Sequence, residues 1–314
     1  MSDITAAAPS SLPLQALSTA IAGTVAVAAP SVVAVHSQRS RSSGFVWRPG
    51  LVVTADEALG EEDGISVTLP GGETVAASLA GRDPTTDIAL LRVDGAAATA
   101  AALPPVTLEK SPLPVAPGAL VLIVGSQGGA PVAGLGVVSV AGPGWRSLRG
   151  GEIDARIELD LKLRHRAEGA LALDASGRAF GMAVFGPRRR VLVIPAATIE
   201  RVADKLATSG RIARGYLGLG LQPVRLDDDG AGGTSGGSVG AVMVMSVDRQ
   251  GPGAAAGIRQ GDVLVAWDGR PIRSVQALLR ALGPDSVGST VTLSLRRAGE
   301  PADVALTIGE RAQA

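Results

Sequence analysis

The feature that most restricts the fold is a long series of short β-branched runs, separated by glycine, proline and aspartate. The 42 glycines and 20 prolines among 314 residues supply closely spaced turns, which favours short strands over long helices. A dozen such strands predicts a mainly β chain with two barrels. We expect these strands at Ser31–His36, Gly44–Trp47, Leu51–Thr54, Ile65–Leu69, Glu73–Ala80, Ile88–Val93, Leu120–Val124, Val132–Val140, Ile153–Leu161, Ala170–Leu173, Ala179–Phe185 and Val191–Ile194.

The strand series ends at an amphipathic segment, Ala196–Ser209, which predicts a helix that ends at Ser209-Gly210-Arg211. A second unit follows from about Arg214. Its Gly-, Ser- and Asp-rich run at Asp227–Ser238 predicts a surface loop. We expect strands and two helices in this unit, in the order Leu217–Leu221, Gly240–Val247, helix Ala254–Ile258, Val263–Trp267, helix Val275–Leu282, Thr290–Arg296 and Asp303–Ile308.

Composition excludes several classes of function. A hydrophobic content of 46% with 18% charged residues indicates folded domains. The absence of cysteine excludes disulfides and thiolate zinc sites. Net charge is zero and no basic stripe is interleaved with aromatic residues, so we expect no nucleic-acid partner. We expect no cofactor either.

The N-terminal region from Leu12 to Val35 is apolar, yet no Lys or Arg precedes Arg39. A signal peptide has a positively charged leading region, which is missing here. Several polar residues and Pro30 interrupt the run and make a poor transmembrane helix. These observations predict a helix from about Leu14 to Ala29 that packs on the following domain, and a cytoplasmic protein without a membrane span.

Four sequence blocks together resemble the HtrA (Deg) family, which joins a trypsin-like protease domain to a PDZ domain. The resemblance covers Leu14 to Arg311 and implies a trypsin-like double β-barrel followed by a small β-barrel or sandwich with two helices. It divides the chain into an N-terminal segment (1–30), a double-barrel domain (31–208) and a PDZ domain (209–314). The blocks are Ala29–Val35 with Ser43–Trp47, Leu51–Leu59, Asp83–Val93, and Ile157–Ala170 with Gly177–Met182 and Ile194–Pro195.

The resemblance also shows where the catalytic triad is degenerate. Asp87 matches the aspartate, Glu57 falls at the histidine and Glu168 falls at the serine. Arg166 replaces a glycine whose N–H would help to form the oxyanion hole. A glutamate cannot reproduce an activated hydroxyl backed by a neutral imidazole, so a pseudoprotease is expected.

The acidic residues themselves leave two interpretations open. If the fold is kept, Glu57, Asp87 and Glu168 converge on one cleft and raise at least one carboxyl pKa. They are candidate ligands for a divalent cation, with His165 as a fourth group. Alternatively, Arg164, Arg166 or the Arg188–Arg190 run neutralises them. His165 and His36 are the only histidines, and His165 is expected in a surface loop.

The second unit retains the features of a peptide-binding PDZ domain. Arg214–Gly220 resembles a carboxylate-binding loop, in which the N–H groups of Leu217, Gly218 and Leu219 would hold a peptide terminus beside Tyr216. The peptide would add as a strand beside the helix at Val275–Leu282. Four residues are expected to line an apolar pocket or to form core: Leu219, Val275, Leu278 and Leu282.

Three functions remain open on sequence alone. The first is a pseudoprotease that binds peptide C-termini or unfolded chains as an adaptor, chaperone or regulator, with an active HtrA relative as one partner. The second is an active serine endopeptidase, and the third is a metal-binding protein. The family resemblance also implies a homotrimer and offers a periplasmic location as the alternative to the cytoplasm.

Overall fold

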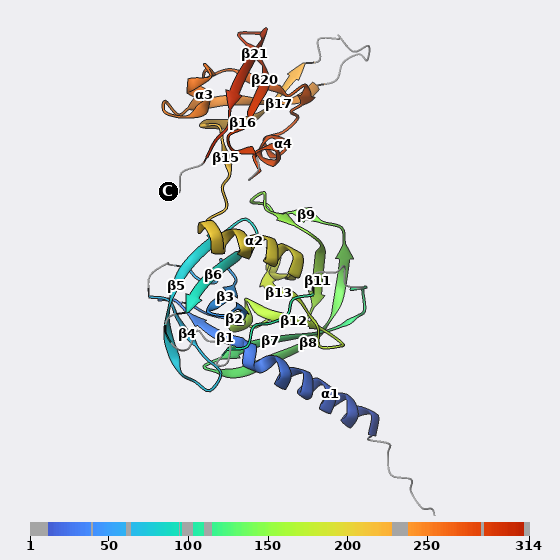
Figure 1. The fold of residues 1–314 in the computed structure, drawn as a ribbon. Helices are drawn as coiled ribbons and strands as arrows, with labels where there is room; N and C mark the ends of the chain where they lie inside the picture. The colour runs from blue at the N-terminus through green and yellow to red at the C-terminus, as the bar shows by residue number, and fades with distance from the viewer. Residues whose placement is uncertain are drawn as a thin grey trace, which may run out of the picture. The chain divides into compact units, whose positions relative to one another are not determined.

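The computed structural model describes residues 12–38, 40–60, 64–93, 95, 103–109, 115–227, 238–283 and 286–310. The chain divides into two compact units, residues 1–211 and 212–314. Strands dominate both units, and the first contains two closed six-stranded barrels (Figure 1). The expected mainly β fold class with a double β-barrel is therefore confirmed.

The N-terminal helix forms, but most of it does not pack as predicted. Helix α1 spans Leu12–Ala28 and leads into the short helix η1 (Ala29–Ser31), close to the predicted bounds. Leu14 is 74% exposed and Val27 is 82% exposed, and only the last turns approach the first unit, near Gly177. Apolar residues on all sides give the helix no single face to bury.

By length and composition alone, the segment Pro13–Ser31 is apolar enough to cross a membrane. Length and composition alone do not identify a membrane span, so the expected absence of a span stays a prediction. An N-terminal signal sequence would have the same character.

The first barrel has the strand order β1-β2-β3-β6-β5-β4. Its core is built from alternating valine, leucine and isoleucine residues that point inward from each strand. The strands are β1 (Val32–His36), β2 (Arg41–Arg48), β3 (Leu51–Thr54), β4 (Ser66–Thr68), β5 (Thr74–Asp83) and β6 (Ile88–Val93).

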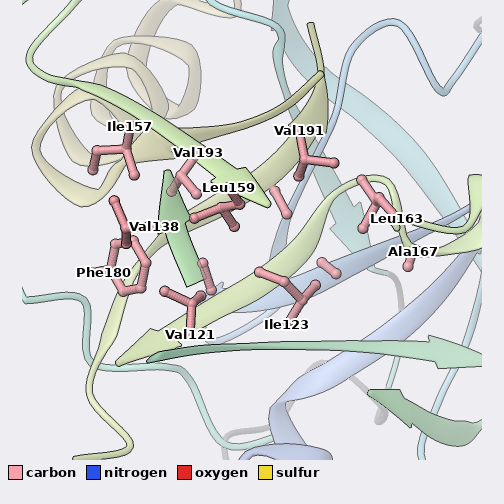
Figure 2. Packing of buried hydrophobic residues seen from close by; sticks show 13 residues of the cluster. Val121, Ile123, Val138, Ile157, Leu159, Leu163, Ala167, Phe180, Val191 and Val193 are labelled. Carbon is pink, nitrogen blue, oxygen red and sulfur yellow. The ribbon is translucent and has the colours of Figure 1, made fainter. Parts of the chain in front are cut away.

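The second barrel has the order β11-β14-β13-β12-β7-β8. Figure 2 shows Phe180, Val138 and Ile157 among the side chains that fill it. Its strands are β7 (Leu120–Gln127), β8 (Ala130–Gly142), β11 (Arg156–Asp160), β12 (Ala170–Asp174), β13 (Ala179–Phe185) and β14 (Val191–Pro195), and a separate hairpin joins β9 (Trp145–Arg146) to β10 (Glu152–Ile153).

The prediction of a single strand at Ile153–Leu161 is wrong, because the strand is interrupted between β10 and β11. Asp154 lies at this break and its N–H donates to the Thr198 hydroxyl at 3.0 Å. Its carboxylate accepts from the Thr198 hydroxyl at 2.6 Å and from Arg201 at 2.8 Å. These bonds tie the break to helix α2 (Ala196–Ser209).

Helix α2 is confirmed at its predicted bounds and ends the first unit. Ile199, Val202, Ala203 and Leu206 form its buried face. Gly210 terminates the helix with a φ of 70°, and its N–H donates to the Leu206 carbonyl. A left-handed glycine at this position is a common helix stop.

The second unit is a five-strand antiparallel path, β16-β17-β18-β20-β21, with β19 paired to β18 and a small β15–β22 pair. The strand predicted to begin at Leu217 begins two residues later, at Leu219, because Gly218 adopts a φ of 70° between β15 and β16. The predicted loop at Asp227–Ser238 lies outside the described residues except at its two ends. The elements are β15 (Gly215–Tyr216), β16 (Leu219–Asp227), β17 (Ser238–Val247), α3 (Pro252–Ala255), β18 (Val263–Trp267), β19 (Arg270–Pro271), α4 (Val275–Ala281), β20 (Thr290–Arg297), β21 (Glu300–Thr307) and β22 (Gly309–Glu310).

Candidate functional site

The fold brings Glu57, Asp87 and Glu168 toward one region between the two barrels. Glu57 follows β3, Asp87 precedes β6 and Glu168 precedes β12. The Asp87 carboxylate accepts a hydrogen bond from the Glu57 N–H at 2.8 Å. The charges of Glu57 and Glu168 both act on the Asp87 carboxyl, so the three acids are electrostatic neighbours.

Asp87 is the most perturbed acid in the cleft. Burial raises the pKa of Asp87 from 3.8 to about 8, and the negative charges of Glu57, Glu168 and Asp56 add to the effect. The N–H of Glu57 opposes it by stabilising the charged form. Asp87 also has a left-handed φ of 58°, an uncommon conformation for a residue with a side chain. The carboxyl therefore keeps its proton at neutral pH.

Glu57 is paired with an arginine that the sequence did not indicate. Arg149 places its Nη2 3.0 Å from Glu57 Oε1, and both side chains are about half exposed. Arg149 Nη1 also donates to the Pro84 carbonyl at 3.1 Å. The predicted neutralisers, Arg164, Arg166 and Arg188–Arg190, are not the cations that pair with Glu57.

The segment Ser147–Gly151, named here the covering loop, is held against the turn that carries Asp87. The Ser147 hydroxyl donates to the Thr85 carbonyl at 2.5 Å. A Cβ on Gly151 would lie 2.2 Å from the same carbonyl, so only glycine allows this approach. Arg149 is therefore positioned by the backbone of its loop.

Glu168 is buried, with 9% of its surface exposed. Its Oε1 accepts a hydrogen bond from the Phe185 N–H at 3.3 Å. Burial raises the pKa of Glu168, and the charge of Glu57 adds to this, whereas the Phe185 N–H and the charge of Arg189 lower it. The side chain is thus turned into the protein and held by a backbone donor.

The backbone before Glu168 does not form an open pair of amide donors. Residues His165–Ala167 form the short helix η3. The Glu168 N–H donates to the His165 carbonyl at 3.3 Å, and the Ala167 N–H donates to the Arg164 carbonyl at 2.8 Å. An oxyanion hole needs such N–H groups directed at the substrate.

The side chains of the two histidines make their contacts with residues outside the acid cluster. His165 Nε2 lies 2.9 Å from Arg189 Nη2, and its ring packs on Phe185 at 5.3 Å. His36 Nε2 lies 2.8 Å from Thr68 Oγ1, and burial lowers the pKa of His36, with the charge of Arg41 adding to the effect.

His36 and Thr68 are close enough for His36 to act as a base and Thr68 as a nucleophile. Whether they could do so depends on how accessible Thr68 is. Thr68 is 4% exposed, and its hydroxyl is also 2.9 Å from the Thr74 hydroxyl. These residues lie on adjacent strands of the first barrel. The threonine therefore lies in a cross-strand network and does not line the neighbouring cavity.

Two cavities flank the cleft. A polar cavity of about 830 Å³ is lined by residues that include His36, Glu57, His165, Arg166 and Glu168. A more apolar cavity of about 230 Å³ lies between the covering loop and the segment Phe185–Pro187. Within the described part of the chain, no group of three His, Asp or Glu side chains could hold a metal ion.

The second unit places its proposed peptide-binding residues at the edge of the sheet. Strand β16 ends the strand order and pairs with β17, and its other edge is the one to which a peptide strand could add. The preceding turn is fixed because the Gly218 carbonyl accepts from the Asp248 N–H and the Leu217 carbonyl accepts from the Gly253 N–H. The Tyr216 hydroxyl donates to Asp248 at 2.9 Å.

Helix α4 and Leu282, which directly follows it, supply two of the four predicted apolar residues to the core. Leu278 is 1% exposed and Leu282 is 8% exposed, and both belong to the hydrophobic core. Leu219 and Val275 are only partly buried against that core. Leu279 is 51% exposed and was missed by the sequence analysis, although its place one residue after Leu278 turns it away from the core.

Comparison with known proteins agrees with this architecture. A trypsin-like peptidase domain matches residues 42–182, and a PDZ domain matches residues 215–308. A protein of Rhizobium meliloti named "Probable periplasmic serine endoprotease DegP-like" is 30% identical over 281 residues, covering 86% of this chain and 53% of that protein. The relative with the same name from Halomonas elongata is 31% identical over 289 residues, covering 88% and 58%. The chain thus spans about half the length of these relatives.

Solved structures share the fold at lower identity. A serine endoprotease from Yersinia pestis has a TM-score of 0.70 at 24% identity, covering 93% of this chain and 98% of that one. The HtrA-type protease AlgW with a decapeptide also has a TM-score of 0.70, at 22% identity, covering 94% and 99%. With its trypsin-like peptidase domain, its PDZ domain and its DegP-like relatives, this chain belongs to the HtrA/Deg family.

Proposed function

We propose that this protein is an HtrA-type pseudoprotease, whose trypsin-like domain does not hydrolyse peptide bonds by a serine mechanism. The observation that carries the proposal is the set of contacts made by Glu57 and Glu168, which occupy the histidine and serine positions of the triad. Glu57 is paired with Arg149, and Glu168 is buried against the Phe185 N–H. Neither carboxylate supplies an attacking alcohol or a neutral imidazole.

The competing function is an active serine endopeptidase, which the names of the relatives favour. It would need another nucleophile and base in the cleft. His36 and Thr68 have the required distance, but Thr68 is buried and bonded to Thr74. Geometry therefore favours the pseudoprotease.

The PDZ domain supplies the proposed activity, which is the binding of peptide C-termini or unfolded chains. The open edge of β16 and the Tyr216–Leu219 turn support this role. Such binding suits an adaptor, a chaperone or a regulator of an active HtrA relative. We assign residues 1–30 to an N-terminal segment, 31–208 to the double barrel and 209–314 to the PDZ domain, and propose a homotrimer formed through the N-terminal segment.

The cytoplasmic location expected from the sequence finds no support, because the matching relatives are named as periplasmic proteins. We propose a periplasmic location instead. The apolar and largely exposed helix α1 supports it, since such a helix suits a signal sequence or a membrane anchor.

The test combines activity and binding assays on the full-length protein. Casein digestion and labelling with a fluorophosphonate probe would be measured with trypsin as the positive control, and we expect neither reaction. A fluorescent peptide with a free C-terminal carboxylate should bind, and its amidated counterpart should bind more weakly. Hydrolysis that is lost in Thr68→Val would establish the competing function.

A further inference from the structure

We propose that the loops Leu161–Ala167 and Gly186–Arg190 form a basic face that binds acidic, apolar segments within polypeptides. The face consists of Lys162, Arg164, Arg166, Arg188 and Arg189, all of which are exposed. This second binding site is separate from the PDZ domain. It rests on the proposed function only in that the bound segment is not cut.

In the part of the chain that the structure describes, four cations of the basic face have no acidic partner, whereas several other arginines of the first unit form ion pairs. Across the described residues, Lys162, Arg164, Arg166 and Arg188 make no side-chain hydrogen bond or ion pair. Elsewhere, Arg178 pairs with Asp174 at 2.8 Å and Arg146 pairs with Glu152 at 3.4 Å. Like charges gathered without counter-charges repel one another, and an anionic ligand removes that repulsion.

The fold holds the two loops together despite this repulsion. Arg189 Nη2 lies 2.9 Å from His165 Nε2, and the Arg189 guanidinium lies over the Phe185 ring at 5.3 Å. Arg190 Nη1 anchors the base of its loop to the buried Glu158 at 3.2 Å. Both loops are therefore fixed by contacts that leave the remaining cations exposed.

Backbone strain also supports a binding role for the basic face. Arg188 and Arg189 are consecutive residues with left-handed φ angles of 59° and 58°. This conformation is unfavourable for a non-glycine residue, and such strain is concentrated at ligand-binding and active sites. The chain thus holds two neighbouring cations in an unfavourable conformation.

The surroundings of the basic face indicate the class of ligand. Phe185, Gly186 and Pro187 line the apolar cavity of about 230 Å³, and Arg188 follows Pro187 in the chain. Glu57 and Asp87 lie on the cavity wall as well, but Glu57 is paired with Arg149 and burial raises the pKa of Asp87 to about 8. Cations next to a recessed apolar cavity fit a peptide with alternating acidic and apolar side chains. Nucleic acid is disfavoured because the ring of Phe185 already packs against His165 and Arg189 and is not a free platform for base stacking. A lipid surface would need a flat apolar face instead of a recess.

The experiment measures fluorescence anisotropy of a short labelled peptide that alternates glutamate with valine or leucine. The peptide is amidated at its C-terminus, so that the PDZ domain does not capture it. We expect saturable binding that weakens when sodium chloride rises from about 50 to about 300 mM. A peptide with lysine in place of glutamate should not bind.

Matched variants locate the site. Arg164→Gln with Arg188→Gln should weaken binding of the acidic peptide by about tenfold or more. The control, Arg146→Gln with Arg178→Gln, removes the same charge from arginines that already have acidic partners and should leave affinity unchanged. Circular dichroism confirms that both variants are folded.

Three outcomes would overturn the proposal. They are equal binding of the lysine peptide, equal weakening in the control variant, and tighter binding of a poly-dT oligonucleotide or of phosphatidylglycerol vesicles than of the peptide. Mass spectrometry of the bound peptide separates this test from the proposed function. A cut peptide overturns the pseudoprotease, whereas an intact peptide that does not bind overturns only the basic face.

Discussion

Arg149 forms an ion pair with Glu57 at 3.0 Å, at the position where the family resemblance places a catalytic histidine. The same arginine is bonded to the Pro84 carbonyl, and its covering loop is held by the Thr85 carbonyl. The former base position is therefore neutralised by a cation from a different hairpin.

Replacement of Arg149 by glutamine should loosen the covering loop with little loss of stability. Both partners are about half exposed, and such pairs contribute about 0–1 kcal/mol. Hydrogen exchange should become faster at Ser147–Gly151, while the free energy of unfolding measured in urea changes by less than about 1 kcal/mol. Arg178→Gln, which removes a similar exposed pair, serves as the control and should leave exchange in the covering loop unchanged.

Asp87 should make stability fall as pH rises. The pKa of Asp87 in the folded state, about 8, exceeds the ordinary value of 3.8. Between these two pH values the folded state therefore binds more protons than the unfolded state. The stabilising effect of this proton is complete below about pH 4 and is lost by about pH 8. Asp87→Asn keeps an oxygen acceptor for the Glu57 N–H and removes the titration.

Urea unfolding of wild type and Asp87→Asn across this pH range tests whether Asp87 makes stability fall as pH rises. The free energy of unfolding of Asp87→Asn, relative to that of wild type, should increase from low to high pH and then level off. Parallel stability curves would contradict the raised pKa, because the other acids of the cleft are present in both proteins.

Substitution of both triad positions should not restore hydrolysis. In Glu57→His with Glu168→Ser, the N–H of residue 168 still faces the His165 carbonyl, so the oxyanion lacks its donor. Loss of one such donor costs about 100–1,000-fold in rate. We expect no fluorophosphonate labelling of this variant, and strong labelling would show that the loop rearranges readily.

The PDZ turn should depend on Gly218. A Cβ there would lie 2.9 Å from the Gly251 backbone, and the φ of 70° disfavours any side chain. Gly218→Ala should weaken binding of a peptide with a free C-terminus by about tenfold or more. Gly257→Ala is the matched control, because its φ of 77° imposes similar strain in open space, and its peptide affinity should match wild type.

The sequence predicted much of the fold because its periodicity is local. Helix α2 was predicted at its observed bounds, and most strands were placed within a few residues. The failures lie where a distant contact interrupts a β-branched run. Asp154 breaks one predicted strand by bonding to Thr198 and Arg201 on α2, and no local pattern contains that information.

By itself, the sequence determined which chemical groups occupy the triad positions and which glycines permit the turns. Only the tertiary structure decided how those groups are paired. Arg149 and Glu57 are far apart in sequence, and their ion pair depends on a loop carried by the second barrel. Protonation, burial and pairing are properties of the assembled cleft, because they depend on the charges and dielectric surroundings that folding brings together.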